Sequence, residues 1–235
     1  MVRVHIVGEL GSYIVAPTRI EKIKMRHLFS AALIALFATT ARADGTAGDF
    51  DYYVMALSWS PNWCAIEGDD RNSPQCHPSE DFGWVLHGLW PQYERGWPDY
   101  CRTTHNNPTR RQTNDMADIM GTSGLAWHQW NKHGVCTGLN STDYYALSRD
   151  TYNDLVIPQA FRRLTSPVTL PASLIEEAFV SQNPELDPDE ITVTCRSGYI
   201  QEVRICLTKD MEFRRCGADV IRDCTLDDAK FDPVR

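Results

Sequence analysis

The chain has 235 residues, of which 43% are hydrophobic and 23% are charged, and its formal net charge at pH 7 is −8. This length suits a single folded domain with a sizeable core. The excess of acidic residues excludes binding to polyanions through general surface electrostatics, so a nucleic acid would have to be held by a local basic spot and by base stacking.

The N-terminal part of the chain predicts a secretory signal at Met25–Ala43. A basic start is followed by an apolar centre, Leu28–Ala38, and the last three residues form a cleavage site of the small-x-small type. The apolar centre is shorter than the roughly 20 residues that span a bilayer. We expect residues 1–24 to result from a misplaced initiation codon. Cleavage after Ala43 would leave a secreted or periplasmic domain, 44–235, with no membrane segment.

The expected mature domain is more acidic than the whole chain and contains every cysteine. The first 43 residues hold six Lys and Arg but two Asp and Glu, which leaves 17 basic and 29 acidic residues and a net charge of −12. The eight cysteines lie at positions 64, 76, 101, 136, 195, 206, 216 and 224. An even number behind a signal peptide predicts four disulfides, although 105 pairings are possible. No CxxC pair is present, which disfavours a zinc site, and we expect Cys136 in a disulfide instead of acting as a nucleophile.

Aromatic and β-branched residues predict two strands in the first part of the domain, Phe50–Ser60 and Phe82–Leu89, each followed by a proline. Between them, Gly, Pro, Asp and Asn residues predict a loop at Cys64–Pro78. A second irregular stretch, Tyr93–Pro108, is long for a compact domain, and loops of that length are usually functional.

Helical patterns follow at Gln112–Met120, at Leu125–Cys136 with Ser123 as N-cap, at Ser141–Phe161 and at Ala172–Val180. Two alternating strands, Ile191–Cys195 and Tyr199–Leu207, flank a turn and predict a hairpin, and the remaining tail is expected to be irregular. The sequence therefore predicts a single α+β domain, in which helices flank a central, mostly antiparallel sheet stabilised by four disulfides.

The segment Leu125–Cys136, LAWHQWNKHGVC, concentrates polar side chains on one side of the predicted helix. At about 100° per residue, four of them fall within about 140° of one another: His128, Gln129, Lys132 and His133. Imidazole, ammonium and amide groups gathered in this way suit contact with an anion or transfer of a proton. The alternative is a partly exposed amphipathic helix whose histidines have no chemical role.

A second segment, Trp84–Gln92 (WVLHGLWPQ), places a histidine at the end of a predicted strand. His87 alone is more often a structural residue, but Gly88 permits close approach of a ligand and Trp90 offers a flat stacking face. Phosphodiester transfer without a metal needs one histidine to take a proton from an attacking hydroxyl and another to protonate the leaving oxygen. A lysine offsets the charge that builds on the phosphoryl oxygens. The two segments together contain these groups.

A metal site is the main competing interpretation of the histidines. Zinc helices of the HExxH type space their histidines by four and carry a glutamate between them. Here His128 and His133 are five apart, the glutamate is missing, and Lys132 would repel a cation. We therefore expect no metal and no other cofactor. A serine hydrolase is disfavoured because no G-x-S-x-G motif occurs.

The two segments resemble the active-site segments of the ribonuclease T2 family, HGLWPQ (His87–Gln92) and HQWNKHGVC (His128–Cys136), in the same order and about forty residues apart. ALSWSPNWC (Ala56–Cys64) is similar to that family's first strand, and the resemblance covers most of residues 50–224. It implies an α+β endoribonuclease that is secreted or periplasmic and independent of metals. Such enzymes cut single-stranded RNA by attack of the ribose 2′-hydroxyl on phosphorus, giving 2′,3′-cyclic phosphate ends, and leave DNA intact.

The resemblance also implies roles for individual residues. His87 would be the general acid and His133 the general base. Lys132 would stabilise the transition state, and His128 would contact the phosphate. The assignment of acid and base depends on the resemblance and not on the spacing of the residues.

Base binding is the least defined part of the implied site. By resemblance, Trp90 would stack on a base, and Gln92 stands at a position that varies in the family and influences base preference. Tyr93, Trp97 and Tyr100 in the long loop are further stacking candidates, although loop aromatics pack on their own domain about as often as they meet ligands. The sequence predicts no particular base preference.

Gln129 is the main departure from the family pattern, which usually has Glu at this position. An amide cannot take a proton or carry charge, although it can still donate to a phosphoryl oxygen. Because both histidines and the lysine remain, an active enzyme is the favoured interpretation. The alternative is a non-catalytic or weakly catalytic RNA-binding or nucleotide-binding homologue. A hydrolase of another phosphodiester would show itself by cleaving DNA.

The family further implies a set of disulfides and a simple assembly. The implied pairs are Cys64–Cys76, Cys101–Cys136, Cys195–Cys224 and Cys206–Cys216. The expected partner is single-stranded RNA, and the mature protein is expected to be a monomer.

Overall fold

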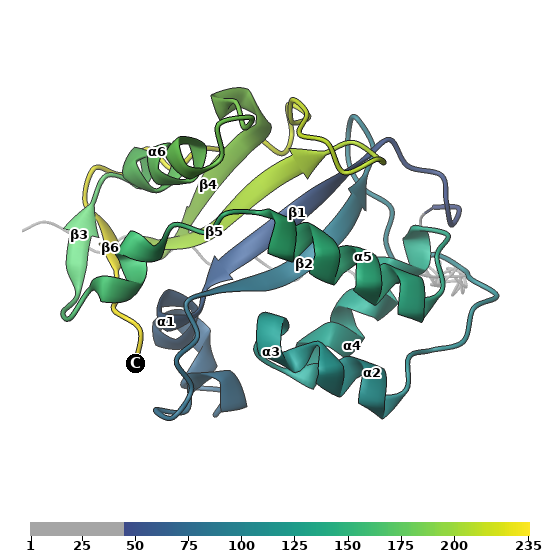
Figure 1. Cartoon of the computed structure of the whole chain (residues 1–235), viewed down its shortest axis with the longest axis horizontal. Coiled ribbons are helices and arrows are strands. Elements are labelled where there is room, and N and C mark those ends of the chain that lie inside the picture. Colours follow the sequence, from purple (N-terminus) through teal and green to yellow (C-terminus); the bar gives the residue numbers. More distant parts are fainter. Residues whose placement is uncertain (1–44) are drawn as a thin grey trace, which may run out of the picture. The chain divides into compact units, whose positions relative to one another are not determined.

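The computed structural model describes residues 45–235 (Figure 1), so the predicted signal Met25–Ala43 and residues 1–24 lie outside the described residues. Six strands form one sheet: β1 (Tyr52–Trp59), β2 (Trp84–Gln92), β3 (Val168–Leu170), β4 (Ile191–Arg196), β5 (Tyr199–Leu207) and β6 (Ala229–Phe231). The α-helices are α1 (Ser60–Trp63), α2 (Arg110–Asp115), α3 (Ala117–Met120), α4 (Ser123–Lys132), α5 (Ser141–Asp154) and α6 (Ala172–Gln182). Shorter 3-10 or π turns occupy Cys64–Gly68, Pro74–Cys76, Gly134–Cys136, Gln159–Arg163 and Pro188–Glu190.

The sheet is mostly antiparallel, which confirms the predicted α+β architecture. Its strands lie in the order β2-β1-β5-β6-β3, and β4 also pairs with β5. Among the described pairs, only the short contact between β5 and β6 is parallel. The predicted hairpin is formed by β4 and β5, and it turns at Ser197 and Gly198, whose φ angles are 53° and 82°. Positive φ at two successive residues is the geometry of the tight turns that join twisted strands.

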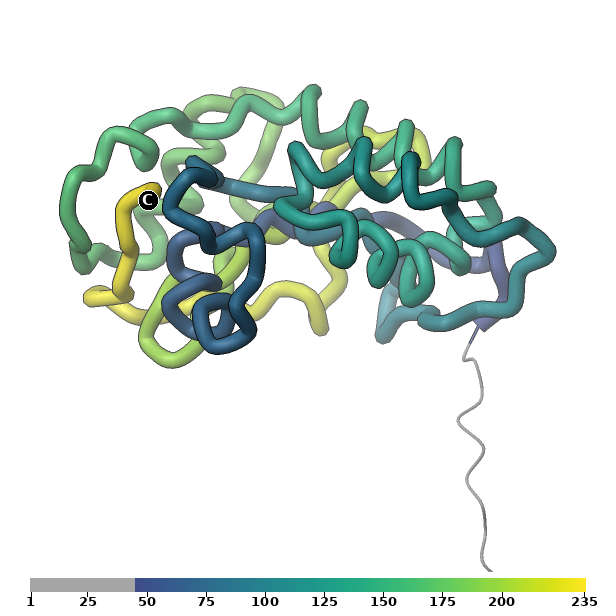
Figure 2. The backbone as a smooth tube through the Cα atoms, turned by 90° about the horizontal axis from the view of Figure 1, so that it is seen from below, coloured from purple at the N-terminus to yellow at the C-terminus, as the bar shows by residue number. Residues whose placement is uncertain are grey.

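The alternation of side chains along β1 gives the sheet two different faces. Tyr53, Met55 and Leu57 enter the main hydrophobic core, whereas Tyr52 and Val54 belong to a smaller buried group. Helices α3, α4 and α5 pack on β2, and α6 packs on β4. Figures 1 and 2 show α2 to α5 grouped beside β2, away from α6. The smaller group lies beside the pocket described below.

Strand β2 runs further than the sequence predicts. It continues from Trp84 through Pro91 to Gln92, so the expected end at Leu89 is wrong. Pro91 lies opposite Tyr53 of β1, and β2 stands at one edge of the sheet. An edge strand has a neighbour on one side only, so the amide hydrogen that proline lacks is not needed to bond a second strand.

Two of the predicted helical segments are divided or shortened, whereas α6 runs to Gln182, two residues beyond the predicted end at Val180. The segment Gln112–Met120 is divided into α2 and α3 at Met116, and the predicted helix Ser141–Phe161 ends at Asp154. Pro158 has no amide hydrogen to continue the helical ladder, so only a separate 3-10 turn follows it. Within residues 45–235, none of the helices has the length and apolarity that crossing a bilayer requires.

Two segments expected to be irregular contain regular structure. The predicted loop Cys64–Pro78 holds a π turn and a 3-10 turn, and the polar tail supplies β6. Strand β6 pairs with β3 at three positions. Three residues are too few to show an alternating pattern, so neither strand had a usable signal.

All eight cysteines are paired in four disulfides. The pairs are those that the family resemblance implied: Cys64–Cys76, Cys101–Cys136, Cys195–Cys224 and Cys206–Cys216. Each links segments that the sequence alone left free to pair in other ways.

Candidate active site

His87 stands at a β-bulge in the middle of β2. In the pairing of β1 with β2, Ala56 lies opposite Gly88 and Leu57 lies opposite Leu86, which leaves His87 as the extra residue of the bulged strand. A bulge of this kind re-aims a side chain. Leu86 is fully buried in the main core, whereas the side chain of His87 is 33% exposed and lines a pocket.

Helix α4 supplies the other predicted polar groups and ends sooner than expected. Thr122, and not Ser123, is the N-cap, and its side chain accepts a hydrogen bond from the amide of Leu125 at 3.0 Å. The helix ends at Lys132, and His133 is its C-cap residue, with φ −116° and ψ −47°. The prediction of one continuous helix to Cys136 is therefore wrong, and His133 reaches the pocket from the end of the helix.

The backbone directly after His133 is tightly enclosed. A Cβ atom on Gly134 would lie 2.6 Å from the ring of Trp130 and 3.0 Å from the ring of Tyr144, so a larger residue has no room. In the long loop, the amide of Tyr100 donates to the carbonyl of Lys132 at 2.8 Å. The neighbouring Cys101–Cys136 disulfide joins the same two segments. The loop thereby holds the end of α4 in place.

The structure brings all the predicted site residues into one pocket of about 410 Å³. Strand β2 contributes His87, Trp90 and Gln92, and α4 with its C-cap contributes His128, Gln129, Lys132 and His133. The rest of the lining comes from β1, the long loop, β5 and the C-terminal segment: Val54, Trp97, Gln201, Glu202, Arg204, Asp219 and Val220.

Trp90 and Gln129 connect the two predicted segments directly. The indole Nε1 of Trp90 donates to Oε1 of Gln129 at 2.7 Å. The Trp90 ring also stacks on His133, with centroids 5.2 Å apart and an angle of 27° between the planes. A Cβ atom on Gly88 would lie 2.3 Å from Oε1 of Gln129. Glycine at position 88 therefore leaves the space that the Gln129 side chain occupies.

Glu202 and Arg204 on β5 belong to the site but were not predicted. Nδ1 of His87 lies 2.5 Å from Oε1 of Glu202. Arg204 donates to the other oxygen of the same carboxylate, from Nε at 3.0 Å and from Nη2 at 2.7 Å. Burial alone would raise the pKa of Glu202, but the hydrogen bond from His87 and the charges of His87 and Arg204 outweigh it and lower the pKa to about 2.

The electrostatic environment differs between the histidines of α4 and its cap. Burial, followed by the charges of Lys132, His87 and His128, lowers the pKa of His133 to about 2. Burial and the charges of Lys132 and His87 also lower the pKa of His128, which is more exposed. His133 is therefore a neutral imidazole in the ligand-free pocket at neutral or mildly acidic pH.

The aromatic candidates of the long loop differ in position. Trp97 is 54% exposed and lines the pocket, so it is available to a ligand. Tyr100 is 50% exposed and lies outside the lining. Tyr93 is partly buried and packs against the main core. Only Trp97 of these three is placed to contact a ligand in this pocket.

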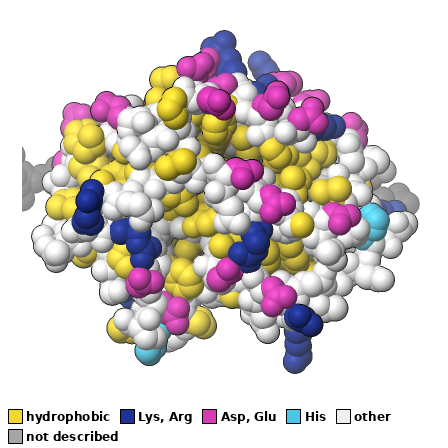
Figure 3. All heavy atoms as spheres, viewed as in Figure 1, with side chains coloured by type: hydrophobic (Ala, Val, Ile, Leu, Met, Phe, Trp, Pro, Cys, Tyr) yellow, Lys and Arg dark blue, Asp and Glu magenta, His cyan; other side chains and the backbone are white. Residues whose placement is uncertain are grey.

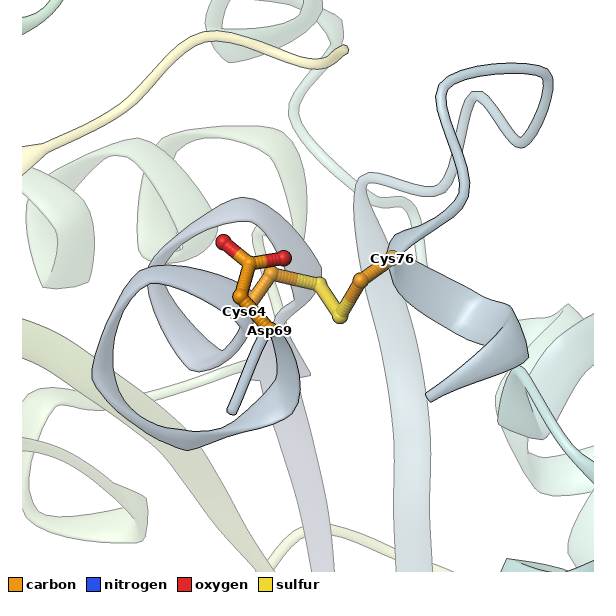
Figure 4. Close-up of side chains that lie close together, drawn as sticks. All are labelled: Cys64, Asp69 and Cys76. Carbon is orange, nitrogen blue, oxygen red and sulfur yellow. A yellow bond between two sulfur atoms is a disulfide. The ribbon is translucent and has the colours of Figure 1, made fainter. Parts of the chain in front are cut away.

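One group of residues with metal-binding side chains lies outside the pocket. Sγ of Cys64, Sγ of Cys76 and a carboxylate oxygen of Asp69 lie within 4.8 Å of one another, as Figure 4 illustrates. The two sulfur atoms are joined in a disulfide, so neither is the thiolate that metals bind. A hydrogen bond from Arg235 lowers the pKa of Asp69 and occupies its carboxylate. We interpret this cluster as structural.

The sequence of the chain matches the model of one protein family. The model of the ribonuclease T2 family matches residues 50–216. The chain belongs to the ribonuclease T2 family.

Similar proteins include ribonucleases from bacteria and eukaryotes. The chain is 45% identical over 123 residues to a ribonuclease from Aeromonas hydrophila, covering 52% of this chain and 54% of that protein. It is 26% identical over 216 residues to ribonuclease DdI from Dictyostelium discoideum, covering 79% of this chain and 89% of that protein. The chain spans about half the length of the curated relatives that it matches first.

Solved structures show the same fold at low sequence identity. RNase NT in complex with 5′-AMP has a TM-score of 0.57 and 20% identity, covering 80% of this chain and 100% of the other. Trichomaglin, described as an S-like ribonuclease, has a TM-score of 0.59 and 18% identity, covering 79% and 98%.

Proposed function

We propose that this protein is a metal-independent endoribonuclease that cleaves single-stranded RNA and leaves 2′,3′-cyclic phosphate ends. The observation that carries the proposal is the meeting of His87, His133 and Lys132 in one pocket, built from two separate segments of the chain. Membership of the ribonuclease T2 family supports the same reaction.

The proposed reaction is an internal transfer at phosphorus. His133 takes the proton of the ribose 2′-hydroxyl while the oxygen of that hydroxyl forms a bond to phosphorus. The bond from phosphorus to the 5′-oxygen breaks, and His87 gives that oxygen a proton. Lys132 offsets charge on the non-bridging oxygens, and His128 contacts the phosphate. The two histidines end with exchanged protonation states, so a water molecule or solvent must reset them.

The surroundings of the two histidines support this assignment of roles. Burial, followed by the charges of Lys132, His87 and His128, lowers the pKa of His133 to about 2, and a neutral imidazole suits a proton acceptor. His87 is 33% exposed and lines the same pocket, so its ring is accessible to a leaving oxygen. A bound phosphate offsets the nearby cationic charges and so increases the basicity of His133.

The reaction requires a 2′-hydroxyl, so the protein is expected to cleave RNA and to leave DNA intact. The pocket offers two means of holding a nucleotide, a cationic group at Lys132 and an exposed indole at Trp97. Single-stranded RNA exposes the bases that an aromatic side chain can stack on. Gln92 is buried in the same lining and is proposed to contribute to base contacts.

The alternative is a non-catalytic or weakly catalytic binder of RNA or nucleotides, because Gln129 replaces the usual Glu. In this structure Gln129 is 1% exposed and accepts the hydrogen bond of Trp90. An amide fulfils that positioning role without charge. This observation favours the active enzyme, since the proton-transferring groups are elsewhere.

A single experiment separates the enzyme from the binder. Purified protein is incubated with polyuridylate in the presence of EDTA, and the products are analysed for 2′,3′-cyclic phosphate. We expect cleavage that falls by at least about a hundredfold in His87→Ala and in His133→Ala. His77→Ala is the matched control, because His77 is an exposed histidine outside the pocket. Binding without turnover in the unmodified protein would establish the binder, and cleavage of a 2′-deoxy polymer would establish another phosphodiesterase.

The four disulfides support a place of action outside the reducing cytoplasm. We propose that the mature protein begins after Ala43, is secreted or periplasmic, and acts as a monomer. N-terminal sequencing of the exported protein tests the first part.

A further inference from the structure

Glu202 is a charged residue in a place where charge is costly. It lies in β5, between β1 and β4, opposite Ser58 and Thr194, and its side chain is 3% exposed. A buried carboxylate destabilises a protein unless it is paired and hydrogen-bonded. Both of its oxygens are paired, one with His87 and the other with Arg204.

The contact with Glu202 determines which ring nitrogen of His87 carries the proton that can be transferred. An ionised carboxylate only accepts hydrogen bonds, so the nitrogen that faces Oε1 of Glu202 must carry a proton. That nitrogen is Nδ1. The proton that His87 can exchange with a ligand is then the one on Nε2. Arg204 fixes the carboxylate with two hydrogen bonds, which limits its rotation.

We propose that Glu202, held by Arg204, is a positioning residue for His87, which keeps Nδ1 protonated and directs the transferable proton to Nε2. This inference rests on the proposed function, in which His87 protonates the leaving 5′-oxygen. During that step the Nε2 proton moves to the oxygen, the Nδ1 proton stays, and Glu202 remains ionised. In this role Glu202 acts through His87 and transfers no proton itself.

Several charged or titratable groups surround His87. Those from α4 and its cap are His128, Lys132 and His133, those from β5 are Glu202 and Arg204, and Asp219 lies in the C-terminal segment. Of these described groups, Glu202 is the one hydrogen-bonded to the His87 ring. Removal of its charge therefore acts directly on His87, as well as on Arg204.

The decisive comparison uses two substrates that differ in their need for a general acid. A dinucleotide such as UpU has an alkoxide leaving group that must be protonated, whereas uridine 3′-(4-nitrophenyl phosphate) releases a stable phenolate. In Glu202→Gln we expect kcat/KM for UpU to fall by at least about tenfold, with little change for the nitrophenyl substrate. His87→Ala should show the same selectivity to a larger degree. An equal loss on both substrates, or no loss on either, would overturn the inference.

A conservative variant gives a second readout. Glu202→Asp keeps a carboxylate that can accept the hydrogen bond of His87 Nδ1, so it should restore part of the activity on UpU that Glu202→Gln loses. The ratio of kcat/KM for UpU to kcat/KM for the nitrophenyl substrate should then lie closer to that of the unmodified protein than to that of Glu202→Gln. Glu67→Gln is the matched control: Glu67 pairs with Arg196 at 2.9 Å outside the pocket, so both activities should be unchanged.

A measurement on the unmodified protein covers the case in which Glu202→Gln fails to fold. Ring 15N shifts of His87 at alkaline pH should show the neutral tautomer with the proton on Nδ1. A proton on Nε2 would contradict the inference. If the unmodified protein cleaves neither substrate, the proposed function fails and the inference falls with it. If it cleaves both and Glu202→Gln has no selective effect, the inference alone fails.

Discussion

The side chain of Gln129 is buried between the two halves of the pocket. Its Oε1 accepts from Nε1 of Trp90, and Trp90 in turn stacks on His133. A glutamate at this position would offer the same acceptor, because carboxylate and amide oxygens both accept hydrogen bonds. The difference between the two residues is therefore charge, placed close to His128, Lys132 and His133.

The variant Gln129→Glu tests what that charge does. We expect the maximal rate on RNA to change by less than about tenfold, because the acid, the base and the lysine are unaltered. The added negative charge opposes the effects that lower the pKa of His133, so its pKa should rise. Protonated His133 cannot act as the base, and the acidic limb of the rate profile should therefore move to higher pH. Steady-state kinetics across pH provide the measurement.

Gln129→Leu is the control that removes the hydrogen-bond acceptor at this position without adding a charge. It removes the acceptor of Trp90 Nε1 and leaves a partly buried donor without that partner, which costs up to about 1–3 kcal/mol. This variant should lose stability and activity together. A rise of several orders of magnitude in Gln129→Glu would contradict our interpretation and show that the natural protein is a weak catalyst or a binder.

At the scale of elements, the position of His133 depends on the segment in which α4 ends. The Cys101–Cys136 disulfide joins the long loop to the turn after His133. We expect the double variant Cys101→Ser, Cys136→Ser to lose stability, by about 4 kcal/mol if chain entropy dominates. Activity at a temperature where the variant is still folded should also fall, because His133 is no longer held against Trp90. Thermal unfolding and RNA cleavage are measured on the same samples.

The Cys195–Cys224 disulfide provides a matched control. Its sequence separation is 29, compared with 35 for Cys101–Cys136, so the entropic contributions are similar. It does not contribute to the described pocket lining. Its double serine variant should be destabilised to a similar degree but keep its activity while folded. Equal losses of activity in both variants would show that the first effect reflects general stability.

The sequence was informative about the helix face but not about the helix end. His128 and Lys132 reach the pocket as the angular pattern predicts, since α4 is regular up to Lys132. His133 is the C-cap residue, and its amide still donates to the carbonyl of Gln129, so it too lies on the predicted face. The residue that follows, Gly134, packs against Trp130 and Tyr144. Contacts from distant segments of the chain leave no periodic signal near the residue that they position.

The same reason explains why Glu202 and Arg204 were missed. They lie two residues apart on a strand whose other residues are mostly buried. Two charged residues on the same side of such a strand were the one signal in the sequence that could have pointed to them. Their partner His87 is 115 residues earlier in the chain. The two-motif pattern located the residues that we propose to react, and they do line one pocket. The positions of Glu202 and Arg204 beside them depend on the pairing of β1 with β5 and on the bulge in β2.

For the whole molecule, the acidic composition limits how RNA can be held. The expected mature domain carries a net charge of −12. Figure 3 shows acidic and basic side chains interspersed on one face, without a continuous basic patch. Of the pocket residues, only Lys132 and Arg204 carry a permanent positive charge, and Arg204 is paired with Glu202. Binding should therefore neutralise few phosphates.

Few phosphate contacts predict a weak dependence of affinity on salt. For single strands, the slope of log K against log salt is about −0.7 per phosphate neutralised, so one or two contacts give about −0.7 to −1.4. The dissociation constant of a short oligonucleotide with one 2′-deoxy residue at the cleavage position is measured by fluorescence anisotropy, since this change blocks the reaction and keeps the phosphates. Lys132→Gln should make the slope shallower by about 0.7. A slope steeper than about −3 would contradict the expectation, because it would require a basic surface that extends well beyond the pocket.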